Sequence, residues 1–135
     1  MKKQWFLVAM LSVFVASLVF TSLALAPVAQ AKGTDIRISL KGSAQFPNAK
    51  GTAKYRDRGG EKEFQVEVEN VKALAGKTLS VFANGKKVGS LKINNLGAGS
   101  LNLNSARGNS VPAIGAGSKV QVKTGAGVLV VSGQF

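Results

Sequence analysis

Apolar and polar residues alternate along much of the chain, and this period of two is the feature that most limits its possible folds. Phe64, Val66 and Val68 alternate with charged or amide residues, and residues 36–40 show the same pattern. Such alternation places the apolar side chains on one face of a β-strand, whereas a helix would repeat about every 3.6 residues. Helical periodicity is nearly absent after residue 31, so we predict an all-β fold.

Glycine-rich segments separate the alternating runs and mark turns between strands. The runs predict about eight short strands, at residues 35–40, 51–58, 61–70, 78–83, 87–93, 98–104, 119–124 and 127–134. Short strands at this spacing are typical of an antiparallel β-sandwich or a small barrel.

The dipeptide Asn84-Gly85 stands between two of these runs. Both residue types readily adopt the positive φ values of a type I′ turn, so the dipeptide predicts a two-residue hairpin loop. Gly89, on the following strand, is a candidate position for a β-bulge. A weak repeat also includes this region, because AGKTLSVFANG at 75–85 resembles AGSKVQVKTGA at 116–126. The repeat indicates a duplicated hairpin unit.

Residues 1–31 have the features of a secretory signal peptide. The segment Met1–Gln4 carries two lysines, residues 5–26 are almost wholly apolar, and Pro27 precedes the small-x-small motif AQA at 29–31. These features predict cleavage after Ala31, which leaves residues 32–135 as a single all-β domain that is secreted or periplasmic. The signal segment itself is expected to enter the bilayer as a helix.

An uncleaved signal anchor is the alternative, and it would leave the domain tethered to the membrane. The apolar run is long enough to span a hydrocarbon core of about 30 Å. No other segment is long and apolar enough to do so. The chain has no cysteine, which excludes both a disulfide framework and a lipid anchor on an N-terminal cysteine.

Charge is distributed unevenly along residues 32–135, which carry 16 basic and 6 acidic residues and a formal charge of +10. All six acidic residues precede residue 70: Asp35, Asp57, Glu61, Glu63, Glu67 and Glu69. The second half of the chain is therefore uniformly positive and should attract anionic polymers. The alternative is that the charge serves only to keep the protein in solution.

Histidine and cysteine are both absent, and this excludes several classes of chemistry. Zinc, copper, haem and iron–sulfur sites lose their usual ligands, and Ser–His or Cys–His nucleophilic pairs cannot form. The glutamates of residues 61–69 share odd positions, which is typical of one solvated strand face. Asp57 and Glu61 are the one candidate calcium pair, but Arg56 and Arg58 beside them oppose a cation. We expect a protein that is not an enzyme and needs no cofactor or metal.

Lysines of the second half form the candidate binding site for a polyanion. Lysine acts as a compact point charge and suits phosphate or uronic acid groups. The candidates are Lys77, Lys86, Lys87, Lys92, Lys119 and Lys123. An alternative role for lysines beside a hairpin is to prevent edge-to-edge pairing of sheets.

The segment KYRDR at 54–58 places an aromatic residue among cations, as in proteins that bind single-stranded nucleic acids. The favoured interpretation is instead a hairpin strand whose charges pair with EKE at 61–63 across the Gly59-Gly60 turn.

The segment LKGSAQFPNAKGTAKYRDRGGEKEFQVEVENV, residues 40–71, resembles the opening of CHRD domains, modules named from chordin that are common in exported bacterial proteins. The matching positions are Leu40, Gly42, Pro47, Gly51, Ala53, Tyr55, Phe64, Val66 and Val68. The closing VLVVSGQF is loosely similar to the final strand of these domains, but their histidine-containing segment is missing. The rest of the second half resembles small secreted bacterial proteins. The resemblance implies an extracellular β domain and supplies no catalytic residues.

Two functions remain open from the sequence. The first is an exported, non-enzymatic β-sandwich with a binding or structural role at the cell surface or in the periplasm, where its basic second half binds an anionic polysaccharide or another polyanion. The second is a protein-interaction subunit or secreted inhibitor that joins a protein partner through an edge strand such as 127–134.

Overall fold

A computed structural model describes residues 33–135, which form one compact unit. The predicted signal peptide, residues 1–31, lies outside the described residues. The unit contains eight antiparallel strands, which confirms the predicted all-β fold, and two short 3-10 helices, η2 (Lys72–Leu74) and η3 (Ser105–Arg107). The strands are β1 (Thr34–Gly42), β2 (Lys50–Arg58), β3 (Glu61–Glu69), β4 (Thr78–Ala83), β5 (Lys86–Lys92), β6 (Gly99–Asn104), β7 (Lys119–Lys123) and β8 (Leu129–Gln134).

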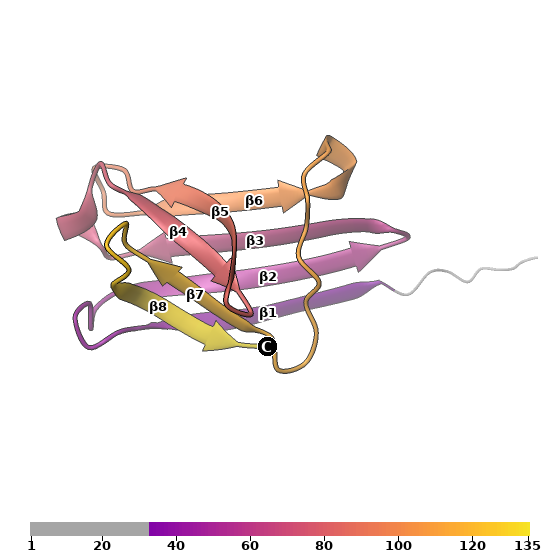
Figure 1. Cartoon of the computed structure of the whole chain (residues 1–135), viewed down its shortest axis with the longest axis horizontal. Coiled ribbons are helices and arrows are strands. Elements are labelled where there is room, and N and C mark those ends of the chain that lie inside the picture. The colour runs from indigo at the N-terminus through magenta and orange to yellow at the C-terminus, as the bar shows by residue number, and fades with distance from the viewer. Residues whose placement is uncertain (1–32) are drawn as a thin grey trace, which may run out of the picture. The chain divides into compact units, whose positions relative to one another are not determined.

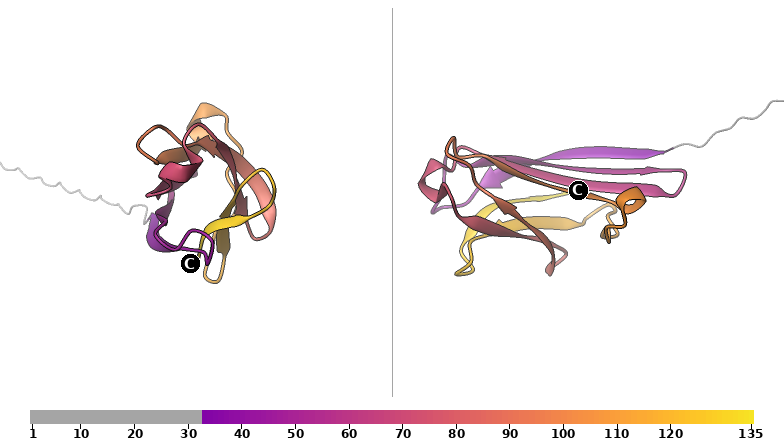
Figure 2. Two further views of the ribbon diagram at one scale, coloured as in Figure 1. Left: turned by 90° about the vertical axis from the view of Figure 1, so that its left-hand side faces the viewer. Right: turned by 90° about the horizontal axis from the view of Figure 1, so that it is seen from above.

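The eight strands form one coiled, nearly closed sheet in the order β5-β4-β7-β8-β1-β2-β3-β6 (Figure 1). Two halves of this sheet face each other across the core, as the end-on and top views of Figure 2 show. We call β1, β2, β3 and β6 half-sheet A, and β4, β5, β7 and β8 half-sheet B. No helix within residues 33–135 has the length and apolar character to cross a membrane.

The core lies between the two half-sheets and explains the alternation in the sequence. Phe64 and Val66 of β3 are fully buried, and Val81 of β4 and Val122 of β7 are fully buried from the opposite side. The residues between them on each strand point to solvent. The predicted strand faces are therefore correct, and each strand contributes one apolar face to a shared interior.

The first edge of the near-barrel is β5, and the second is β6. They approach each other without a hydrogen-bonded ladder. A Cβ atom on Gly89 would lie 2.7 Å from the Leu101 side chain, so this glycine allows β6 to pack closely against β5. The register of β4 and β5 shifts beside Gly89, where Val88 is the additional residue, and this confirms the predicted bulge.

The sequence repeat corresponds to two hairpins of the same design, β4–β5 and β7–β8. Their registers shift at Val81/Phe82 and at Val122/Lys123, which are equivalent positions of the repeat. Strands β4 and β7 pair antiparallel, with Val81 opposite Val122. A pseudo-two-fold axis through this pair therefore relates the two hairpins of half-sheet B.

A glycine precedes each hairpin at the equivalent position. Gly76 and Gly117 have φ angles of 81° and 86°. Gly76 N–H donates to Ile93 O and Gly117 N–H donates to Phe135 O, both at 2.7 Å. The likeness of the two segments thus extends from the side-chain pattern to the backbone hydrogen bonds.

Asn84 and Gly85 form the predicted tight turn, with φ angles of 51° and 81°. Asn84 also joins the hairpin to β7, because its Oδ1 accepts from Lys119 N–H at 2.9 Å and its amide donates to Ser118 Oγ at 3.3 Å. The asparagine therefore has two roles, in the turn and between the hairpins.

The joint between the half-sheets is short, and Gly42 lies in it. Strand β1 pairs with β8 only through Lys41–Ser132 and Gly42–Val131. A Cβ atom on Gly42 would overlap Phe46 O and lie 2.7 Å from Ala49 O, both of them backbone atoms. Both atoms belong to the loop between β1 and β2 and cannot rotate away as a side chain could, so the glycine is required for this loop to pack against the end of β1.

Replacing Gly42 by alanine is expected to destabilise the domain by about 1–3 kcal/mol, because the new methyl group must displace backbone. Urea unfolding followed by circular dichroism measures this loss. Gly125→Ala is the matched control, because a Cβ atom there meets nothing within 4 Å. Equal stability of the two variants would contradict the close packing of the β1–β2 loop against Gly42.

Candidate functional site

The structure separates the six candidate lysines into three groups. Lys87, Lys92, Lys119 and Lys123 project from the outer face of half-sheet B, since their neighbours Leu91, Val120 and Val122 point into the core. Lys86 lies at the turn between β4 and β5. Lys77 precedes β4 and so lies at its other end.

A fifth lysine, Lys41 of β1 in half-sheet A, borders this group at the joint with β8 and was not among the candidates. Strand register aligns one outward row across the sheet: Lys87, Phe82, Gln121, Ser132 and Lys41. With about 4.8 Å between strands, the path along the curved sheet from Lys87 to Lys41 is about 19 Å. We call Lys41, Lys87, Lys92, Lys119 and Lys123 the basic face.

Phe82 lies in the middle of the basic face and is partly buried. The Lys123 ammonium lies 5.0 Å from the centroid of its ring, within the range of a cation–π contact. Lys87 is opposite Phe82 in register. The aromatic ring thus contacts one lysine of the basic face, and strand pairing places the backbone of a second beside it.

Within residues 33–135, no ion pair involves a lysine of the basic face, and only Lys41 lies on a strand that carries a carboxylate, Asp35 of β1. Strands β4, β5, β7 and β8 carry neither aspartate nor glutamate. The ion pairs of the described residues all lie on half-sheet A and all involve arginine: Arg56–Asp35, Arg56–Glu63 and Arg58–Asp35. The lysines of the basic face are therefore available to a ligand.

The KYRDR segment forms most of β2, and the favoured hairpin interpretation is confirmed. Arg56 lies opposite Glu63 in register, and Arg56 Nη1 donates to Glu63 Oε1 at 3.2 Å. The exposed fraction of Tyr55 is 6 %, so its ring belongs to the core. A buried tyrosine has no face on which a nucleobase could stack.

The outward glutamates of β3 share one face, as predicted. Glu61, Glu67 and Glu69 are exposed, and Glu63 is partly buried between Arg56 and Asn102. Residues 33–135 contain no group of three or more histidine, cysteine, aspartate or glutamate side chains that could hold a metal ion.

The prediction that residues 127–134 form an edge strand is wrong. Strand β8 begins at Leu129 and lies between β7 and β1, pairing with both. The edges are β5 and β6 instead. Sequence pattern could not reveal this order, because the pairing of β8 with β1 joins distant parts of the chain.

No protein-family model, curated protein sequence or solved structure matches the chain. The resemblance of residues 40–71 to CHRD domains therefore stays a prediction from those residues.

Proposed function

We propose that the protein is an exported, non-enzymatic β domain that binds an anionic polysaccharide through the basic face. The observation that carries this proposal is a group of five lysines, four of them on half-sheet B, whose strands carry no side-chain carboxylate, and the fifth, Lys41, on the adjoining strand β1. Export rests on the signal-peptide features of residues 1–31.

The chemistry of the basic face suits an extended polymer with repeated negative charges. Lysine ammonium groups attract anions without demanding a fixed geometry, so the face can accept sulfate, phosphate or uronate groups. The path of about 19 Å along the curved sheet from Lys87 to Lys41 is too long for one small anion but suits several charges along a chain. Such a ligand would lie across β5, β4, β7, β8 and β1.

Neutralising two lysines of the basic face is the direct test. At low salt, Lys87→Gln/Lys123→Gln should weaken heparin binding by residues 32–135 about 30-fold, since each lost contact costs about 1 kcal/mol. Isothermal titration calorimetry gives the affinity. Lys54→Gln/Lys62→Gln is the matched control, because it removes the same charge from half-sheet A and should have a much smaller effect. Similar losses of affinity in the two variants would show that net charge alone drives heparin binding.

A protein partner at a sheet edge is the second candidate function, now at β5 or β6. Strand β5 is poorly suited to pairing, because Lys86, Lys87 and Lys92 and the bulge at Val88 are features that oppose edge-to-edge contact. Strand β6 has no charged residue and is the more suitable edge. Binding to one partner at fixed stoichiometry and with little dependence on salt would favour this function over the first.

A further inference from the structure

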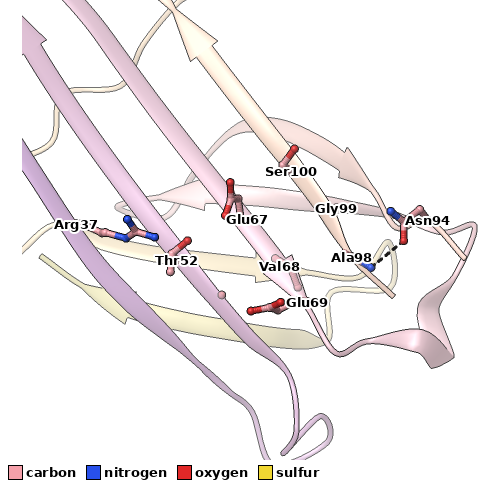
Figure 3. A pocket seen from close by; sticks show the side chains of 10 residues that line it. Arg37, Thr52, Glu67, Val68, Glu69, Asn94, Ala98, Gly99 and Ser100 are labelled. Carbon is pink, nitrogen blue, oxygen red and sulfur yellow. Dashed lines mark hydrogen bonds between the residues drawn. The ribbon is translucent and has the colours of Figure 1, made fainter. Parts of the chain in front are cut away.

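A groove lies on the outer face of half-sheet A (Figure 3). It is open to solvent and has a volume of about 340 Å³. Polar side chains from β1, β2, β3, β6 and the β5–β6 loop line it: Arg37, Thr52, Glu67, Glu69, Asn94 and Ser100. No aromatic or large aliphatic side chain projects into it.

Two glycines account for the depth of the groove. Gly51 and Gly99 occupy inward positions on either side of Val68, and their backbone forms part of the groove floor. A Cβ atom on Gly51 would lie 2.6 Å from Glu67 O, and one on Gly99 would overlap Lys92 O. Because neither position has room for a side chain, the backbone can lie close to the core and leave the outer face hollow.

The polar groups that line the groove are largely unused within the protein. Among residues 33–135, the side chains of Arg37, Glu69 and the two hydroxyl residues have no hydrogen-bonding partner, and Glu67 accepts only from Gln65, at 3.1 Å. Such groups can exchange water for ligand atoms without breaking the fold. The groove thus offers both acceptors and donors.

Asn94 is held in one orientation by its own loop. Its Oδ1 accepts from Leu96 N–H at 2.9 Å and from Ala98 N–H at 3.1 Å. With the oxygen so engaged, the amide NH₂ group is left to donate toward the groove, as Figure 3 shows. A donor that is already oriented loses little conformational freedom when a ligand binds.

We propose that this groove binds a neutral, hydroxyl-rich sugar. A sugar hydroxyl donates one hydrogen bond and accepts others, so neighbouring hydroxyls can bridge the carboxylate of Glu67 or Glu69 and a donor such as Arg37 or Asn94. The two carboxylates and one guanidinium disfavour a polyanion, unlike the basic face. The strands of Arg37 and Ser100, β1 and β6, are three strand spacings or about 14 Å apart along the sheet, which is longer than one sugar ring. The ligand is therefore an oligosaccharide, bound by hydrogen bonds rather than by stacking.

Nuclear magnetic resonance titration of isotope-labelled residues 32–135 tests this proposal. Cellotetraose, maltotetraose and the tetramer of N-acetylglucosamine are the probes, in 0.5 M NaCl so that binding at the basic face is screened. At least one probe should shift the backbone amide signals of Thr52, Glu67, Asn94 and Ser100. In Arg37→Gln/Glu69→Gln, which keeps the net charge, the affinity for that probe should fall about tenfold, as expected for the loss of charged hydrogen bonds.

Two controls distinguish sugar binding in the groove from sugar binding elsewhere on the domain. Asp57→Asn/Lys62→Gln also removes one charge of each sign, outside the groove, and should leave the affinity unchanged. Lys87→Gln/Lys123→Gln should weaken heparin binding without affecting the sugar, so the groove and the basic face can fail independently. Absence of shifts with all three sugars, shifts confined to other surfaces, or groove shifts produced instead by a short charged peptide would overturn the proposal.

Discussion

Raising the NaCl concentration from 50 to 200 mM is expected to weaken heparin binding by about 100- to 500-fold. Each lysine contact releases a condensed counterion, which contributes about 0.7–0.9 to the slope of log K against log salt concentration in nucleic acids. Five contacts, one for each lysine of the basic face, predict a slope of about −3.5 to −4.5. Calorimetric titration at four or five salt concentrations measures it.

The slope of log K against log salt concentration also tests how many lysines contact heparin at the same time. In Lys87→Gln/Lys123→Gln three contacts remain, and the slope should fall to about −2 to −3. An affinity that is constant over this salt range would exclude counterion release and with it the proposed role of the basic face. An unchanged slope in the variant would place the contacts elsewhere on the domain.

Replacing Phe64 by alanine is expected to destabilise the domain by about 3–5 kcal/mol. Phe64 is fully buried on β3 in the middle of half-sheet A, and the cavity left by its ring cannot be filled by neighbours that are themselves held in strands. A domain of this size has about 5–15 kcal/mol of stability, so much of it would be lost. The melting temperature should fall by at least about 12 °C. Circular dichroism follows the transition, and the fluorescence of Tyr55 reports on the core.

Phe82→Ala is the matched control for this variant, since it removes the same side chain from the outer face. Phe82 is only partly buried, so its loss should cost about 1 kcal/mol. Comparable losses of stability in the two variants would show that the core is not located between the half-sheets as described.

Local features of the fold could be predicted from the sequence because they are encoded by neighbouring residues. The alternation around Phe64 defines a strand and its buried face. Asn84 and Gly85 define a turn, because both residue types readily adopt positive φ values. The pairing of KYRDR with EKE follows from the two-residue Gly59-Gly60 loop, which determines the register. In each case the contacts join residues that are close in the sequence.

Strand order could not be predicted, and the errors at the candidate site follow from this. Lys41 was missed because only the pairing of β1 with β8 brings it beside Ser132. Lys77 and Lys86 were predicted to belong to one binding site, although they lie at opposite ends of β4. The groove of half-sheet A carries no motif, because its side chains come from four strands and one loop.

The short joint between β1 and β8 has a consequence for the order of events in folding. Ser43 Oγ donates to Leu129 O across 86 positions of sequence, so the first and last strands meet only after nearly the whole domain has been synthesised. Contacts of such long range form slowly, because a large loop must close before they are made. A nascent chain therefore cannot join β1 to β8 until the last strand has emerged. The two residue pairs that join β1 to β8 are thus among the last contacts of the sheet to form during synthesis.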